Sequence, residues 1–274
     1  MEIIINALNI LLPTLYVLTL GVYALLFFRN DPFADRAAPI LLYTTGIAHG
    51  LDLVFRAIQF NHFPIATVFE AFSLLAFAVL VIYGIIEWRT GVRTTGMFIL
   101  GIVFVFQLVS SAFIASPPSY SPLLTDPIFV AHVSTAILGY SGMAISAIYG
   151  LLYLMLFYDI RKQRFGLIYK QLPPLEIMSG FTYRAAILGF LFLTVAMVLG
   201  LVLLVKVYGT YWSWDPKLMV TFVAWFIYSL GVGAGKLKGW SARRVAFASL
   251  AGFAVIIFSF VVVNLFFTSF HEFI

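Results

Sequence analysis

The sequence predicts an all-α integral membrane protein, a bundle of about eight transmembrane helices. Of the 274 residues, 63% are hydrophobic and only 10% are charged, and the mean hydropathy is +1.06. A soluble domain cannot bury this share of apolar side chains. Polar residues are nearly absent inside the apolar runs, which favours spanning helices over the alternating pattern of a β-barrel.

Each predicted helix is an apolar run of roughly 20 residues or more, the length that spans a bilayer. In chain order the runs cover residues 4–28, 38–60, 64–88, 95–115, 127–158, 184–207, 217–236 and 245–268. The first has no preceding basic region and is long enough to span, so we expect no cleaved signal peptide. The fifth is long enough to extend into water. Pro216 suits the start of the seventh, because proline fits the first helical turn. No internal repeat divides the chain, so residues 1–274 are expected to form a single transmembrane domain.

The basic residues predict the orientation of this bundle. The loops that follow odd-numbered helices hold thirteen of them: Arg29, Arg36, Arg89, Arg93, Arg161, Lys162, Arg164, Lys170, Arg184, Lys236, Lys238, Arg243 and Arg244. The other side holds only Arg56, Lys206 and Lys217. Because cytoplasmic loops are enriched in Lys and Arg, both termini are expected on the outer, periplasmic side. The net charge of +5 is therefore a topology signal, and no nucleic-acid partner is expected.

The chain contains no cysteine. This excludes disulfides, thiolate metal sites and thioether attachment of a cofactor to this chain. Any metal or redox chemistry must use histidine, methionine, carboxylates or a bound cofactor.

The most informative segment is the loop at residues 206–217, which contains Tyr208-Gly-Thr-Tyr-Trp-Ser-Trp-Asp-Pro-Lys217 between two apolar runs. Taken alone, it is an aromatic belt at the membrane surface followed by a capped helix start. The order Tyr211, Trp212, Trp214, Asp215, however, resembles the tryptophan-rich "WWD" signature of the haem-handling proteins of c-type cytochrome biogenesis. These are the CcsA/ResC and HemX-like proteins and, more distantly, CcmC and CcmF.

Other segments resemble the same family in the same order along the chain. They are His49-Gly-Leu-Asp-Leu-Val-Phe-Arg56 with Phe63-Pro-Ile and Val68-Phe-Glu70, Ala131-His-Val133 with Gly139-Tyr140, Phe181-Thr-Tyr-Arg184, and Val263-Asn264 with His271. The resemblance covers residues 41–274. Two positions depart from the CcsA pattern. Leu218 stands where CcsA proteins have Glu, and Leu230-Gly231-Val232 stands where they have Leu-His.

Two histidines on the predicted outer side are the candidate iron ligands. His132 lies near the start of the fifth helix and His271 just past the end of the eighth, so alone each is an ordinary interfacial histidine. Neutral imidazole is a common axial ligand of haem iron. The resemblance implies that His132 and His271 bind the iron of haem b beside the WWD loop.

His49 lies near the middle of the second predicted helix, where an ionisable residue indicates function. The alternative is a neutral histidine that donates to a neighbouring helix. The resemblance implies a second, membrane haem at His49, but its partner histidine in the seventh helix is absent here, so a bis-histidine membrane haem is not expected. Asp52, one turn away, could accept from His49.

The remaining candidates surround the predicted outer site. Tyr211, Trp212 and Trp214 offer flat faces for a porphyrin, and Asp215 could orient the loop. Arg56 and Glu70 are close enough across a short loop to pair. His62 is most simply a loop residue.

The resemblance implies a multi-pass protein of the bacterial inner membrane that presents haem b on the outer face for attachment to apocytochrome c. It also implies a ResB/CcsB-type membrane partner and leaves open whether this chain is a component of a cytochrome c synthase. The alternatives are a HemX-like haem-binding or regulatory protein, and a membrane subunit of a larger complex without synthase activity.

Overall fold

The computed structural model describes residues 2–114, 122–237 and 241–259, and all regular structure in these ranges is helical. The chain divides into two compact units. The N-terminal unit holds α1 (Glu2–Arg29), α2 (Pro32–Phe60), α3 (Val68–Thr90) and α4 (Gly96–Phe113). The C-terminal unit holds α5 (Pro127–Arg161), α7 (Leu175–Tyr208), α8 (Pro216–Leu237) and α9 (Ala242–Phe258). The short helices η1 (Pro122–Thr125) and α6 (Leu167–Gln171) were not predicted.

Seven of these helices, α1 to α5, α7 and α8, are long and apolar enough to cross a membrane. The all-helical, multi-pass membrane architecture is thus confirmed. The eighth predicted span corresponds to α9, which the structure describes over 17 residues only. The count of eight and the orientation of the termini stay predictions, as does the single domain.

Two helices begin six or more residues earlier than the hydropathy predicts. α2 begins at Pro32 and not at residue 38, because the Asp31 carboxylate caps it by accepting from the backbone N–H groups of Phe33 and Ala34. α7 begins at Leu175 and not at residue 184, so its first turns carry Glu176 and Arg184. The length of an apolar run shows which part of a helix can lie in the bilayer, whereas capping residues and prolines decide where the helix begins.

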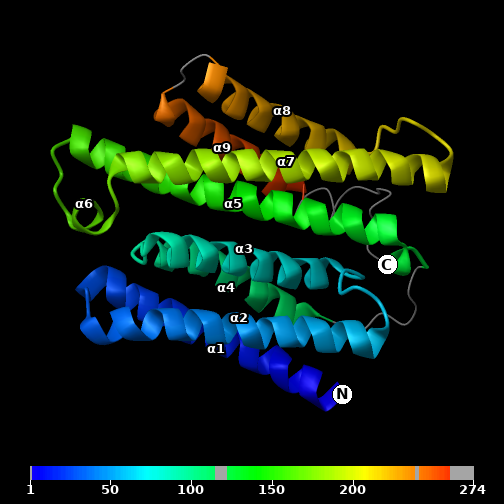
Figure 1. Ribbon diagram of the computed structural model, residues 1–274, viewed down its shortest axis with the longest axis horizontal. Helices are drawn as coiled ribbons and strands as arrows, with labels where there is room; N and C mark the ends of the chain where they lie inside the picture. Colours follow the sequence, from blue (N-terminus) through cyan, green and yellow to red (C-terminus); the bar gives the residue numbers. More distant parts are fainter. Residues whose placement is uncertain (1, 115–121, 238–240, 260–274) are drawn as a thin grey trace. The chain divides into compact units, whose positions relative to one another are not determined.

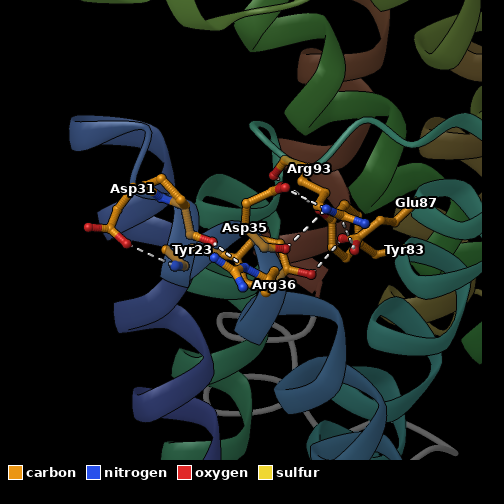
Figure 2. A network of polar contacts seen from close by, with 9 residues as sticks. Tyr23, Asp31, Asp35, Arg36, Tyr83, Glu87 and Arg93 are labelled. Carbon is orange, nitrogen blue, oxygen red and sulfur yellow. Dashed lines mark hydrogen bonds and ion pairs between the residues drawn. The ribbon is translucent and has the colours of Figure 1, made fainter.

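In the N-terminal unit, α1 packs against α2 and α4, and α3 packs against α4 and, less extensively, α2 (Figure 1). One end of this unit is fastened by polar contacts that Figure 2 shows. Pro39 has no N–H to donate to the carbonyl of Asp35 one turn earlier. Arg93 donates to that carbonyl at 3.0 Å and to the Asp35 carboxylate at 2.6 Å. The bond to this carboxylate raises the pKa of Arg93, and Tyr23 donates to the buried Glu87 at 2.5 Å.

In the C-terminal unit, α5 and α7 run side by side over most of their length (Figure 1). Glycines permit this close approach: a methyl group on Gly142 would lie 2.8 Å from Cα of Gly189, and one on Gly139 would lie 2.9 Å from the backbone nitrogen of Leu193. Hydroxyl groups fasten α9 to its neighbours: Ser146 donates to the hydroxyl of Ser249 at 2.8 Å, and Tyr228 donates to the backbone carbonyl of Ser249 at 2.9 Å. These contacts hold α5 and α7 in one register, and that register positions the site described next.

Candidate functional site

His132 lies in the second turn of α5 and points at α7. Its Nδ1 atom is 2.8 Å from the carbonyl oxygen of Ala196. A carbonyl oxygen can only accept, so Nδ1 carries the proton and the lone pair of the neutral ring lies on Nε2. Gly200, one turn further along α7, makes room for the ring, because a methyl group there would lie 2.9 Å from Cε1 of His132.

An ion pair fastens the start of α5 to the end of α7. Lys206 donates to the carboxylate of Asp126, whose other oxygen caps α5 by accepting from Ile128 at 2.9 Å and Phe129 at 3.2 Å. The bond from Lys206 lowers the pKa of Asp126. Because Gly200 and Tyr208 are eight residues apart on α7, His132 lies about 12 Å along the helix axis from the start of the Trp-rich loop.

The Trp-rich loop joins α7 to α8 and turns at Gly209, which adopts φ of +66°. The rings of Trp212 and Trp214 meet edge to face at 5.5 Å and 86°. They therefore cannot both lie flat on one face of a planar ligand. Trp212 is supported by Phe222, whereas Trp214 is 79% exposed and Tyr211 is 81% exposed.

Asp215 is only 6% exposed and caps α8, with Oδ1 accepting from the backbone N–H of Leu218 at 3.0 Å. This cap matches the expectation that Asp215 orients the loop. Lys217, also buried, follows in the first turn of α8. Among the described residues, no three His, Cys, Asp or Glu side chains gather as a metal site. His271, the second predicted iron ligand, and Asn264 lie outside the described residues.

His49 is fully buried in the N-terminal unit, at the centre of a chain of hydrogen bonds. Ser73 donates to Gln107 at 3.1 Å, so its oxygen accepts from Nε2 of His49 at 2.8 Å. Nδ1 then accepts from the hydroxyl of Tyr16 at 2.8 Å. Both ring nitrogens are bonded, and iron could reach either only after one of these partners had moved away. His49 as a haem ligand stays a prediction, and the alternative of a neutral, hydrogen-bonded histidine matches this geometry.

Two predicted pairings were wrong. Asp52 pairs with Arg56 at 2.9 Å and not with His49, because the two residues lie one turn apart on the same face of α2. Glu70 consequently does not pair with Arg56 and accepts from the backbone N–H of Ala66 at 2.6 Å. His62 is buried in the loop that follows α2, where its ring lies over Phe60 and 2.7 Å from the carbonyl oxygen of Phe63.

Several residues that shape these sites could hardly be predicted from the sequence. The Ala196 carbonyl and Gly200 have no sequence signature as partners of His132. Tyr16 looks like any tyrosine of a membrane helix. Gln107 was the one detectable sign, since an amide in the apolar run of α4 indicates a hydrogen bond between helices.

The comparisons with known proteins identify the family. The sequence profile described as "Cytochrome C assembly protein" matches residues 65–271, about three quarters of the chain. The chain belongs to this family. Its role accordingly lies in the maturation of c-type cytochromes.

Among individual family members, the chain is 28% identical to "Cytochrome c biogenesis protein CcsA" of Prochlorococcus marinus, over 82% of this chain and 80% of that protein. It is 26% identical to the CcsA protein of Heterosigma akashiwo over 77% of each chain. These matches confirm the resemblance to CcsA-type proteins.

A solved structure shows the same fold. "Cytochrome c Heme Lyase CcmF" superimposes with a TM-score of 0.66 and 17% identity over 94% of this chain. This chain spans 46% of that protein, so the likeness concerns less than half of the lyase.

Proposed function

We propose that this protein handles haem b in c-type cytochrome maturation and presents it at the outer membrane face for attachment to apocytochrome c. The observation that carries the proposal is the geometry of His132. Its Nδ1–H is held by the Ala196 carbonyl, so Nε2 is the basic nitrogen, and metal-binding histidines are commonly oriented by such a bond. The ring is half-buried and lies about 12 Å along α7 from the start of a loop with exposed aromatic side chains.

In this proposal His132 would bind the haem iron through Nε2, and His271 would be the second ligand. Trp214 offers a flat exposed face to the porphyrin, and Trp212, supported by Phe222, fixes the position of Trp214. Asp215 holds the loop by capping α8. When bound, haem supplies the vinyl groups that react with the thiols of the apocytochrome, and this chain binds and orients it. A ResB/CcsB-type partner would complete the assembly.

Substitution of the two histidines tests the iron ligands. Either His132→Ala or His271→Ala should lower haem content or convert the iron to a five-coordinate form, because each removes one axial ligand. Added imidazole should restore much of the spectrum by occupying the emptied position. His62→Ala, which changes a histidine of the N-terminal unit, is the control. A full complement of six-coordinate haem in both test variants would end the proposal for these ligands.

The second candidate function is a HemX-like haem-binding or regulatory protein without synthase activity. The engaged ring of His49 favours it, because this chain then lacks a second haem ligand within its described helices. Co-expression with a ResB-type partner and an apocytochrome reporter separates the two: attachment of haem that depends on His132 supports the assembly role, and haem binding without attachment supports the regulatory one.

A further inference from the structure

The N-terminal unit carries a groove between α2 and α3 with a volume of about 780 Å³. This volume is within the usual range for small-molecule sites. Every lining residue is glycine, aliphatic or aromatic, and the aromatic ones are Tyr43, Phe77 and Trp88. An acyl chain suits such a lining, whose side chains are apolar apart from the hydroxyl of Tyr43 and the indole N–H of Trp88.

Glycines on both helices create the space. A methyl group on Gly50 would lie 3.5 Å from Phe77, and one on Gly84 would lie 3.6 Å from Tyr43, so both positions face an aromatic wall at ordinary contact distance. These contacts also fix the register of the antiparallel helices, with residue 43 beside residue 84 and residue 50 beside residue 77. The start of α2 and the end of α3 therefore meet at the same end of the groove.

Two arginines lie at that end. Arg36 precedes Tyr43 by seven residues and so continues the groove-lining face of α2. Arg89 follows Ile85 by four residues and continues the lining face of α3. Both are exposed, and neither forms an ion pair within the described part of the chain.

The neighbouring charges leave these two arginines available to a ligand. Asp35, which precedes Arg36, is bound by Arg93 at 2.6 Å (Figure 2). Glu87 is buried and accepts from Tyr23. Trp88, 75% exposed between Glu87 and Arg89, has the amphipathic ring typical of the membrane surface. The end of the groove thus combines an interfacial tryptophan with two uncompensated positive charges, on the side that the basic residues predict to be cytoplasmic.

We propose that this groove binds an anionic phospholipid, with an acyl chain between α2 and α3 and the phosphate at Arg36 and Arg89. Basic sites between transmembrane helices on the cytoplasmic side favour anionic headgroups. The binding site is independent of the haem-handling function. Haem also has an apolar body and an anionic end, but the groove lining offers no axial ligand, and the nearby ring of His49 is bonded at both nitrogens.

The test measures lipid retention by the full chain, using native mass spectrometry with phosphatidylglycerol and phosphatidylcholine of identical acyl chains. We expect phosphatidylglycerol to bind more tightly. Arg36→Gln with Arg89→Gln should remove most of this preference, by roughly fivefold for each arginine. The control, Arg161→Gln with Arg164→Gln, removes the same charge from exposed positions in the C-terminal unit and should leave binding unchanged.

A second variant tests the apolar half of the site. Gly84→Leu places a side chain in the groove and should weaken binding of both lipids. Gly101→Leu makes the same change on α4, where a methyl group would meet nothing within 4 Å, and should bind as the unaltered protein does. If Gly84→Leu does not fold, the variant with Arg36→Gln and Arg89→Gln still tests the proposal, because both arginines are exposed.

Three results would overturn the proposal. They are equal affinity for the two lipids, undiminished phosphatidylglycerol binding in the double arginine variant, and displacement of bound lipid by one equivalent of haemin. The last result would assign the groove to haem.

Discussion

Substitution of Gly200 by alanine is the sharpest test of how this fold positions His132. The added methyl group would lie 2.9 Å from Cε1 of His132, whereas ordinary contacts begin at 3.4 Å, so the ring must shift by about half an ångström or rotate away. Either movement strains the 2.8 Å bond from Nδ1 to the Ala196 carbonyl. Loss of a bond that orients a metal-binding histidine typically costs about 10- to 100-fold in affinity. We expect Gly200→Ala to lower haem affinity within this range.

Gly180→Ala is a matched control for this substitution. Gly180 lies in the same helix, and a methyl group there would meet nothing within 4 Å, so the variant gains the same helix propensity without touching a ligand. Haem content from the pyridine haemochrome spectrum and the low-spin fraction of the iron provide the readout, with the melting temperature as a check on folding. Added imidazole should rescue Gly200→Ala, because it replaces a misplaced ligand. Equal haem affinity in the two variants would refute the reasoning, as would a loss that imidazole fails to restore.

Three further predictions concern other parts of the molecule. His49→Ala should change the low-spin haem spectrum little but lower the melting temperature, since the buried Tyr16 hydroxyl loses its acceptor at a cost of about 1–3 kcal/mol, while Ser73 keeps its bond to Gln107. Loss of a bis-histidine signal would instead show that His49 binds iron. Asp126→Asn keeps the cap of α5 but loses the ion pair with Lys206. Because folding lowers the pKa of Asp126, the pair stabilises the protein above the unfolded-state pKa of about 3.9, and this stability is lost as the pH falls below that value. The melting temperatures of Asp126→Asn and the unaltered protein should therefore converge in acid. A reporter fused after Ile274 should lie outside the cytoplasm and one inserted within 161–170 should lie inside it, and the reverse would overturn the outer placement of the site.

The helices could be predicted because a bilayer imposes one dominant requirement, an apolar run of sufficient length. Hydropathy could not fix the ends, which depend on local chemistry. The Asp31-Pro32 cap starts α2 several residues before its apolar run, and α7 continues beyond its own with charged residues in its first turns. Which helices pack together in the two compact units could not be read from the sequence either, since packing does not depend on the composition of any one helix.

In the candidate site, the sequence could predict only those residues whose side-chain type indicates a function. His132 and the Trp-rich loop were recognisable from residue type and order. The Ala196 carbonyl was not, because every residue has such a carbonyl and this one lies 64 positions from the histidine that it orients. The pairing of Asp52 with Arg56 was missed for a different reason: two acceptors, Asp52 and Glu70, lay within plausible reach of Arg56, and the sequence could not rank them.

The two described membrane histidines show how partners, and not residue type, decide what an imidazole can do. In the N-terminal unit, Ser73 donates its hydroxyl proton to Gln107 and therefore accepts from Nε2 of His49. The lone pair of the ring lies on Nδ1, which accepts from the hydroxyl of Tyr16. In the C-terminal unit, the Ala196 carbonyl forces the proton onto Nδ1 of His132 and the lone pair onto Nε2. The first arrangement is enclosed and ties four helices together through neutral hydrogen bonds. The second belongs to a half-buried ring near a loop with exposed aromatic side chains, which is the arrangement that suits an iron ligand. This contrast is why we propose His132, and not His49, as the haem-binding histidine of the described helices.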